Sequence, residues 1–152
     1  MNKRGISPLI ATFVLLLIAV GLGVIILTVG KAQIESAAQC PVKIDMSLEV
    51  LNGKEQLCLD KSNNKIYFLL ENGAAVDIKM IRLTAVGEKA TYILDLPDSY
   101  VKKAAPLMKN IPYDYSSYGE IKKLKLIPII NLYQEDMVCA GQAIVREKIR
   151  DC

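Results

Sequence analysis

The sequence contains no histidine and no tryptophan among its 152 residues. Without histidine, neither a Ser-His-Asp triad nor a Cys-His pair can form, which excludes the commonest nucleophile–base arrangements. A glycine-rich phosphate loop is also missing, because the one Gly-x-Gly sequence, at Gly21 and Gly23, lies inside a long apolar run. We therefore expect that the chain is not an enzyme, that it has no catalytic residues and that it needs no cofactor.

A strong excess of charge of one sign is lacking as well. Lys and Arg number 19 against 16 Asp and Glu, and Lys3 and Arg4 supply two of the three excess positive charges. Nucleic-acid binding depends on basic patches that neutralise phosphates. The rest of the chain carries only +1, so no nucleic-acid partner is expected.

Four cysteines, at positions 40, 58, 139 and 152, follow the apolar run and form no C-x-x-C pair. Zinc sites usually use close ligand pairs, often with histidine, so no metal site is expected. Disulfides form on the oxidising side of a membrane; the alternative is four buried thiols in a cytosolic protein. We predict the pairs Cys58–Cys139 and Cys40–Cys152, with a Cys40–Cys58 bond as the open alternative.

From Ile6 to Gly30, twenty-five consecutive residues carry no charge. As a helix they would extend for ~37 Å at ~1.5 Å per residue, enough to cross a ~30 Å hydrocarbon core. Pro8 suits the first turn and Ser7 can cap it, while Pro41 ends the helical pattern. The sequence predicts a leader at 1–5, a transmembrane or filament-core helix at 6–39, and a head domain at 40–152.

The head shows the period-two alternation of β-strands. Two segments alternate around Asn-Gly, the strongest short hairpin signal: "VKIDMSLEVLNGKEQLCLD" and "KIYFLLENGAAVDIKMIRLTAV". Further strands are expected in "ATYILDL", "EIKKLKLIPII" and "QAIVREKI", with Pro128 at a sheet edge or a strand end. The predicted fold class is α+β: a long N-terminal hydrophobic helix followed by an all-β, Ig-like sandwich head.

The segment "PDSYVKKAAPLMKNIPYDYSSYG" is predicted to be a long irregular loop. Tyrosine offers a large area with a polar tip and is favoured at interfaces. The candidate surface contacts are therefore Tyr100, Tyr113, Tyr115 and Tyr118. The alternative is that these rings only cover the sandwich edge.

The apolar run does not fit a cleavable secretory signal, whose apolar core is ~7–15 residues long and precedes a small-residue cleavage site. A plain signal anchor fits better, with Lys3 and Arg4 in the cytoplasm and the head outside. However, "KRG" followed by "ISPLIATFVLLLIA" resembles the N-terminus of archaeal type IV pilins, and more distantly that of archaellins and bacterial type IV pilins. The resemblance covers about residues 3–30.

This resemblance implies that a prepilin-type leader peptidase cleaves after Gly5, so that the mature chain begins at Ile6. The recognition and cleavage segment would comprise Lys3, Arg4, Gly5, Ile6, Ser7 and Pro8. It also implies a precursor in the cell membrane, surrounded by lipid, which the pilus assembly machinery adds to an extracellular filament of identical subunits with the head outside.

A helix that is apolar on all sides can be covered either by lipid or by other copies of itself. Small residues permit close helix approach or soften a helix, and the candidates here are Ser7, Ala11, Ala19, Gly21 and Gly23. The sequence therefore favours a structural filament subunit. The alternatives are a non-polymerising, membrane-anchored surface domain for binding or adhesion, and a minor pilin-like component of a secretion system.

Overall fold

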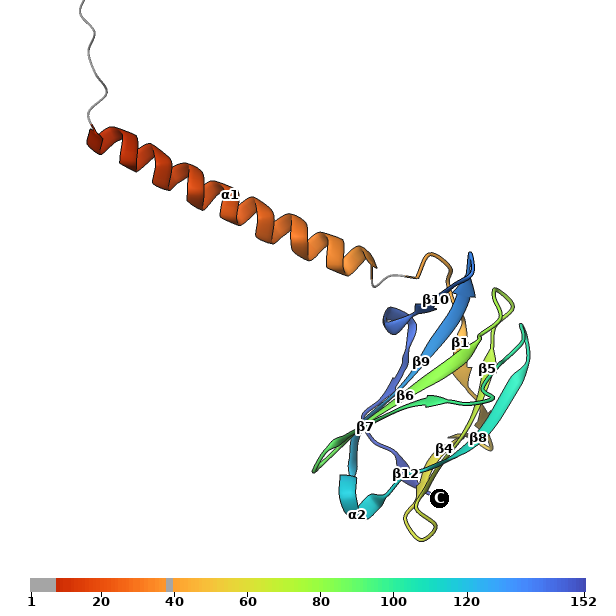
Figure 1. The fold of residues 1–152 in the computed structure, drawn as a ribbon. Helices are drawn as coiled ribbons and strands as arrows, with labels where there is room; N and C mark the ends of the chain where they lie inside the picture. The colour runs from red at the N-terminus through yellow and green to blue at the C-terminus, as the bar shows by residue number, and fades with distance from the viewer. Residues whose placement is uncertain (1–7, 38–39) are drawn as a thin grey trace, which may run out of the picture. The chain divides into compact units, whose positions relative to one another are not determined.

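The computed structural model describes the backbone of residues 8–37 and 40–152, and the side chains of residues 10–24 and 40–152. The chain divides into two units, Met1–Ala37 and Ala38–Cys152, and each is described by itself. The first contains helix α1 (Pro8–Ala37), and the second, which we call the head, contains every strand that the structure describes (Figure 1).

The predicted α+β class, with its long hydrophobic helix, is corrected by the structure. The described fold is mostly β, and no helix in its described residues is both long and apolar enough to cross a membrane. The described apolar side chains of α1 run from Ile10 to Val24.

The head is built from short strands, a one-turn helix and a 3₁₀ turn. In chain order these elements are β1 (Met46–Leu48), β2 (Val50–Leu51), β3 (Lys54–Glu55), β4 (Leu57–Asp60), β5 (Lys65–Asn72), β6 (Met80–Gly87), β7 (Thr91–Leu96), β8 (Pro106–Pro112), α2 (Tyr115–Tyr118), β9 (Ile121–Leu132), β10 (Glu135–Val138), η1 (Ala140–Gln142), β11 (Ile144–Arg146) and β12 (Arg150–Asp151).

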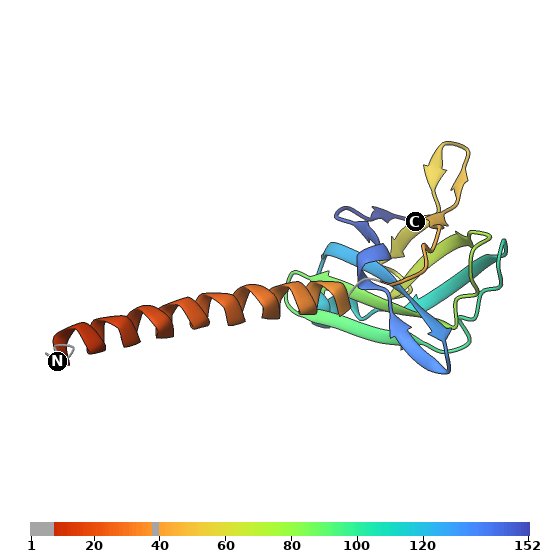
Figure 2. The ribbon, with the colours of Figure 1, turned by 90° about the horizontal axis from the view of Figure 1, so that it is seen from above.

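The first sheet is centred on β5. One side of β5 pairs with β8 from Lys65 to Glu71, and the other side pairs with β4 and then β1. Between β1 and β4 the chain leaves the sheet as the hairpin β2–β3, which projects from the head in Figure 2. The last strand, β12, adds to β4 in parallel and so covers that edge near the C-terminus.

The second sheet has the order β7–β6–β9, with β10 and β11 sharing the far side of β9. Pro128 lies within β9, which is a central strand, so the prediction that it would mark an edge or an end is wrong. Its carbonyl accepts from the N–H of Cys139, in the gap between β10 and β11. In an antiparallel strand the N–H and C=O of one residue point to the same side. The nitrogen of Pro128 therefore faces the gap between β10 and β11, where the ladder needs no N–H donor.

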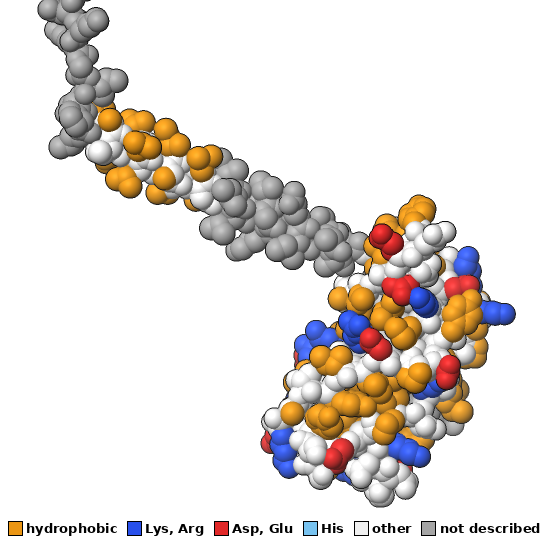
Figure 3. Space-filling view, in the orientation of Figure 1, with side chains coloured by type: hydrophobic (Ala, Val, Ile, Leu, Met, Phe, Trp, Pro, Cys, Tyr) orange, Lys and Arg blue, Asp and Glu red, His pale blue; other side chains and the backbone are white. Residues whose placement is uncertain are grey.

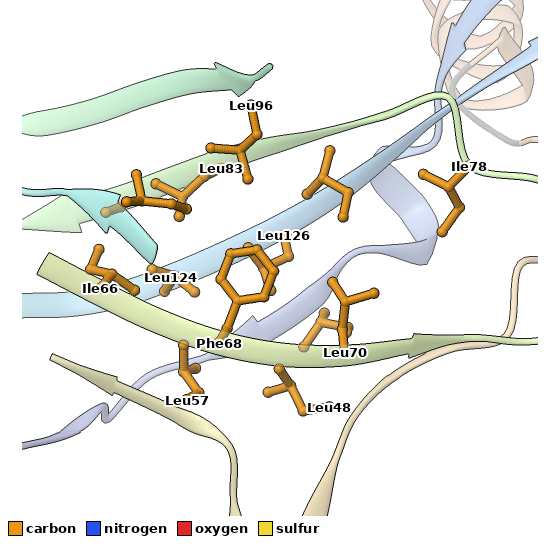
Figure 4. Packing of buried hydrophobic residues seen from close by; sticks show 14 of the residues in the cluster. Leu48, Leu57, Ile66, Phe68, Leu70, Ile78, Leu83, Leu96, Leu124 and Leu126 are labelled. Carbon is orange, nitrogen blue, oxygen red and sulfur yellow. The ribbon is translucent and has the colours of Figure 1, made fainter. Parts of the chain in front are cut away.

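The two sheets face each other across one hydrophobic core, so the predicted β-sandwich is confirmed. Alternate residues of β5 point inward, and Ile66, Phe68 and Leu70 are almost completely buried. Figure 4 shows them facing Leu124 and Leu126 of β9. Burial of each such side chain contributes about 1.5–3 kcal/mol, which makes this layer the main source of head stability.

The two Asn-Gly signals have different outcomes. Asn52 and Gly53 have φ of 53° and 73° and close the hairpin β2–β3, as predicted. The hairpin predicted at Asn72-Gly73 is wrong, because β5 ends there and the chain crosses to the other sheet. The side chain of Asn72 is buried and donates to the carbonyls of Val76, Val101 and Lys102, which fixes that crossing.

Candidate functional sites

The described part of α1 exposes apolar side chains in every direction. Successive helical residues are rotated by about 100°, so Phe13, Val14, Leu15 and Leu16 point to four different sides. All four are exposed, with Leu15 at 67%. Figure 3 shows hydrophobic side chains along the visible side of this part. A helix with no polar face has nothing to present to water, so a partner is needed to cover these side chains.

The small residues predicted to mediate helix packing lie along the same surface. Ala11 and Ala19 are exposed, and a Cβ added to Gly21 or Gly23 would meet no atom within 4 Å. Among the described residues, nothing therefore requires glycine at either position. The predicted peptidase segment and Ser7 fall outside the described residues, except for Pro8, where the backbone of α1 begins.

All four cysteines form disulfides, as predicted, but the predicted pairs are wrong. Cys40 bonds Cys139, and Cys58 bonds Cys152. The physical reason is the topology. Strand β12 runs beside β4, and the described residues before β1 pass close to η1, whose last residue, Gln142, bonds the backbone of Val42 and Ile44. Each bond thus ties a chain end of the head to a distant segment.

The four tyrosines do not form one contact surface. Tyr113 is 1% exposed, and its hydroxyl donates to the carbonyl of Gly119 at 2.9 Å. It packs against Tyr92 and the half-buried Tyr118, with ring centroids 6.0 Å and 5.5 Å away. The structure therefore corrects Tyr113 as a surface contact: its ring closes the sandwich edge. Burial raises the pKa of its phenol, so it stays neutral.

Tyr115 is half-buried, with the ammonium of Lys61 5.6 Å from its ring centroid. Tyr100 alone of the four tyrosines has an exposed ring, at 52%. It borders a hollow of about 340 Å³ that the sequence did not reveal.

This hollow, which we call the Tyr100 pocket, is lined by Val76, Asp77, Lys79, Tyr100, Lys103 and Asn131. Ile78 and Val101 form an antiparallel bridge and point into the core. Because side chains alternate along extended segments, the neighbours of these two residues turn outward together. Asn131 joins them from β9, since the N–H of Lys79 is bonded to β9 at Ile129.

The polar groups of the pocket hold one another in place. Asp77 accepts from the backbone N–H of Lys103 at 2.9 Å and from the hydroxyl of Tyr100 at 2.8 Å. These two hydrogen bonds lower the pKa of Asp77 and keep it ionised. Asp136 on β10 binds the ammonium of Lys79 and accepts from the amide of Asn131, at 2.6 and 2.8 Å.

The described residues contain no group of three or more potential metal ligands and no buried side-chain polar atom without a partner. Neither a protein-family model, nor a curated protein, nor a solved structure matches the chain. Within the described residues, the exposed apolar surface of α1 and the Tyr100 pocket are the features that point to a function.

Proposed function

We propose that the chain is a structural subunit of an extracellular, type IV pilus-like filament, made as a precursor that a prepilin-type leader peptidase cleaves after Gly5. Copies polymerise when the apolar side chains of α1 pack against those of neighbouring copies. The assembly machinery in the membrane is the second partner of the precursor, and lipid is the other apolar surrounding open to α1 before assembly. The head lies outside the cell.

One observation carries this proposal: the described surface of α1 is apolar and exposed on all sides. Full burial of a side chain such as Leu15 or Leu16 is favourable by about 1.5–3 kcal/mol. Ten exposed large apolar residues lie between Ile10 and Val24, so α1 is far more stable in an apolar surrounding than in water. Transfer from lipid to neighbouring copies changes the hydrophobic free energy little, so packing between the helices must favour assembly. Copies of α1 have the small residues that close packing needs.

The two disulfides support the extracellular placement, because such bonds persist outside the cytoplasm. The resemblance of residues 3–30 to pilin N-termini supports the cleavage site. The described residues contain no free cysteine, and all four cysteines of the chain are disulfide-bonded. This leaves any introduced cysteine as a unique thiol.

A cysteine scan of α1 tests the proposal. Single variants Leu15→Cys, Leu16→Cys, Leu17→Cys and Ile18→Cys point in different directions around the helix. In sedimentable material from native cells we expect oxidation to yield covalent dimers for at least one of the four. Met108→Cys in the head, where the side chain is 76% exposed, is the control for random collision.

Two results would contradict the proposal. The first is a chain recovered only as a detergent-soluble monomer. The second is sedimentable material in which none of the four α1 positions cross-links above the Met108→Cys control. Either would favour the non-polymerising surface domain.

A further inference from the structure

The Tyr100 pocket is an open hollow whose polar groups are held in place by hydrogen bonds. Its volume, about 340 Å³, lies within the roughly 300–1,000 Å³ typical of small-molecule pockets. Three segments far apart in the sequence supply its lining, namely the approach to β6, the β7–β8 connection and β9, and Asp136 of β10 holds Asn131. The hydrogen bonds among them fix the side chains before any ligand arrives, which lowers the entropic cost of binding.

Several groups in the pocket keep unused bonding capacity. An ionised carboxylate offers about four lone-pair sites, and Asp77 uses one on each oxygen. The side-chain carbonyl of Asn131 accepts from no donor among the described residues, since this amide bonds only through its nitrogen. Within the described part of the chain, the ammonium of Lys103 has no ion-pair partner.

These groups have different chemical preferences. Asp77 and Asn131 are acceptors and suit hydroxyl donors, whereas Lys103 suits an anion. The hydroxyl of Tyr100 is held by Asp77, which leaves the exposed face of the Tyr100 ring to contact an apolar ring face. A sugar ring that has an apolar C–H face, several hydroxyls and one carboxylate meets all three requirements together.

We propose that the Tyr100 pocket binds an acidic saccharide, a uronic acid unit whose ring lies on Tyr100. Its hydroxyls donate to Asp77 and Asn131, and its carboxylate meets Lys103. A simple inorganic anion suits the pocket less well, because it has no hydroxyls to donate to Asp77 and Asn131 and meets only Lys103. Binding by a single chain does not depend on polymerisation, so this site stands apart from the proposed filament function.

The proposal is tested by titration of the full chain in a detergent without a sugar headgroup. Two-dimensional amide spectra are recorded while methyl glucuronide, methyl glucoside and acetate are added in separate experiments. We expect methyl glucuronide to shift the signals of Asp77, Lys103 and Asn131 along a saturable curve. Methyl glucoside lacks the carboxylate and should bind more weakly, and acetate lacks the ring and should give no saturable shift.

Variants assign the contacts. Tyr100→Ala should weaken glucuronide binding by roughly tenfold, since a ring contact contributes about as much as an aromatic pair. Tyr100→Phe, which keeps the ring, should bind more tightly than Tyr100→Ala. Lys103→Gln should remove the preference for glucuronide over glucoside, and Met108→Ala on the other sheet should change nothing.

Any of three results would overturn the proposal. One is the absence of saturable shifts with methyl glucuronide. Another is an equal response to acetate, which would make the pocket a general anion site. The third is equal binding by Tyr100→Ala and the Met108→Ala control. Each readout comes from a dispersed single chain, so a failure here leaves the filament proposal standing.

Discussion

Removal of either disulfide should destabilise the head, because the unfolded chain then gains conformational entropy, and this gain is nearly the same for the two bonds. Taken alone, Cys40–Cys139 closes a loop of 99 residues and Cys58–Cys152 one of 94, and the chain-entropy relation assigns each about 4.7 kcal/mol at 25 °C. The loops interleave, however. When one bond is intact, the shortest path between the other two cysteines passes through that bond. It covers only 18 residues from Cys40 to Cys58 and 13 from Cys139 to Cys152.

A route of about 31 residues lowers the cost of losing the first bond to about 3.7 kcal/mol, and losing the second then costs the full 4.7 or so. Packing adds an asymmetry, because Cys139 is fully buried whereas Cys152 is exposed. Loss of the buried sulfur adds about 1 kcal/mol. We therefore expect Cys40→Ala/Cys139→Ala to destabilise the head more than Cys58→Ala/Cys152→Ala does.

The assay is equilibrium urea unfolding of the full chain and of the two double variants, all in the same detergent. The fourfold variant is added if it folds. A smaller cost for the Cys40–Cys139 pair than for the Cys58–Cys152 pair would refute the reasoning. So would a fourfold variant that loses less than the sum of the two double variants, because interleaved loops make the second loss the larger one.

Three further predictions concern the head. Gly87→Ala places a Cβ 2.2 Å from the carbonyl oxygen of Tyr118 and should lower the thermal midpoint by several degrees in a calorimetric scan. Asn72→Ala removes the donor of the Val76 carbonyl, while the carbonyls of Val101 and Lys102 keep the N–H groups of Ile78 and Ala105, so it should cost about 1–3 kcal/mol in urea unfolding; an unchanged midpoint would show that the crossing does not need this amide. Hydrogen bonds from Ser116 and then Ser117 lower the pKa of Asp114 from its ordinary value to about 2, so its contribution is complete above pH ~4 and is lost as the pH falls towards 2. Unfolding measured from pH 5 to 2 should therefore show a weaker pH dependence in Asp114→Asn than in the wild-type chain, and parallel curves would contradict the assignment.

The parts of the fold that could be predicted are those with a local cause. The turn at Asn52-Gly53 follows from two adjacent residues that accept positive φ. The strands β5, β6, β7 and β9 follow from alternation of apolar and polar side chains, because one face of each lies on the core.

The parts that were missed depend on pairing across the sheet. Strand β8 (Pro106–Pro112) was predicted to be an irregular loop, since two prolines and an asparagine argue against a strand. It forms because each of its residues has a partner in β5, and prolines at its ends suit an edge strand. Pro128 is tolerated in a central strand only because a gap lies beside it.

The candidate sites divide in the same way. The apolar surface of α1 is visible in the sequence, because it consists of consecutive residues. The Tyr100 pocket is not visible, because Asp77, Lys79 and Asn131 come together only when β6 and β9 pair. The disulfide pairs were missed for that reason too, since only the parallel addition of β12 to β4 brings Cys152 to Cys58.

The most direct test of the central claim is the N-terminal mass of the protein recovered from native cells, measured together with its sedimentation state. The filament account predicts a chain that begins at Ile6 and is found in high-molecular-weight material. An intact Met1 terminus in detergent-soluble monomers would contradict the account and leave a surface domain that does not polymerise.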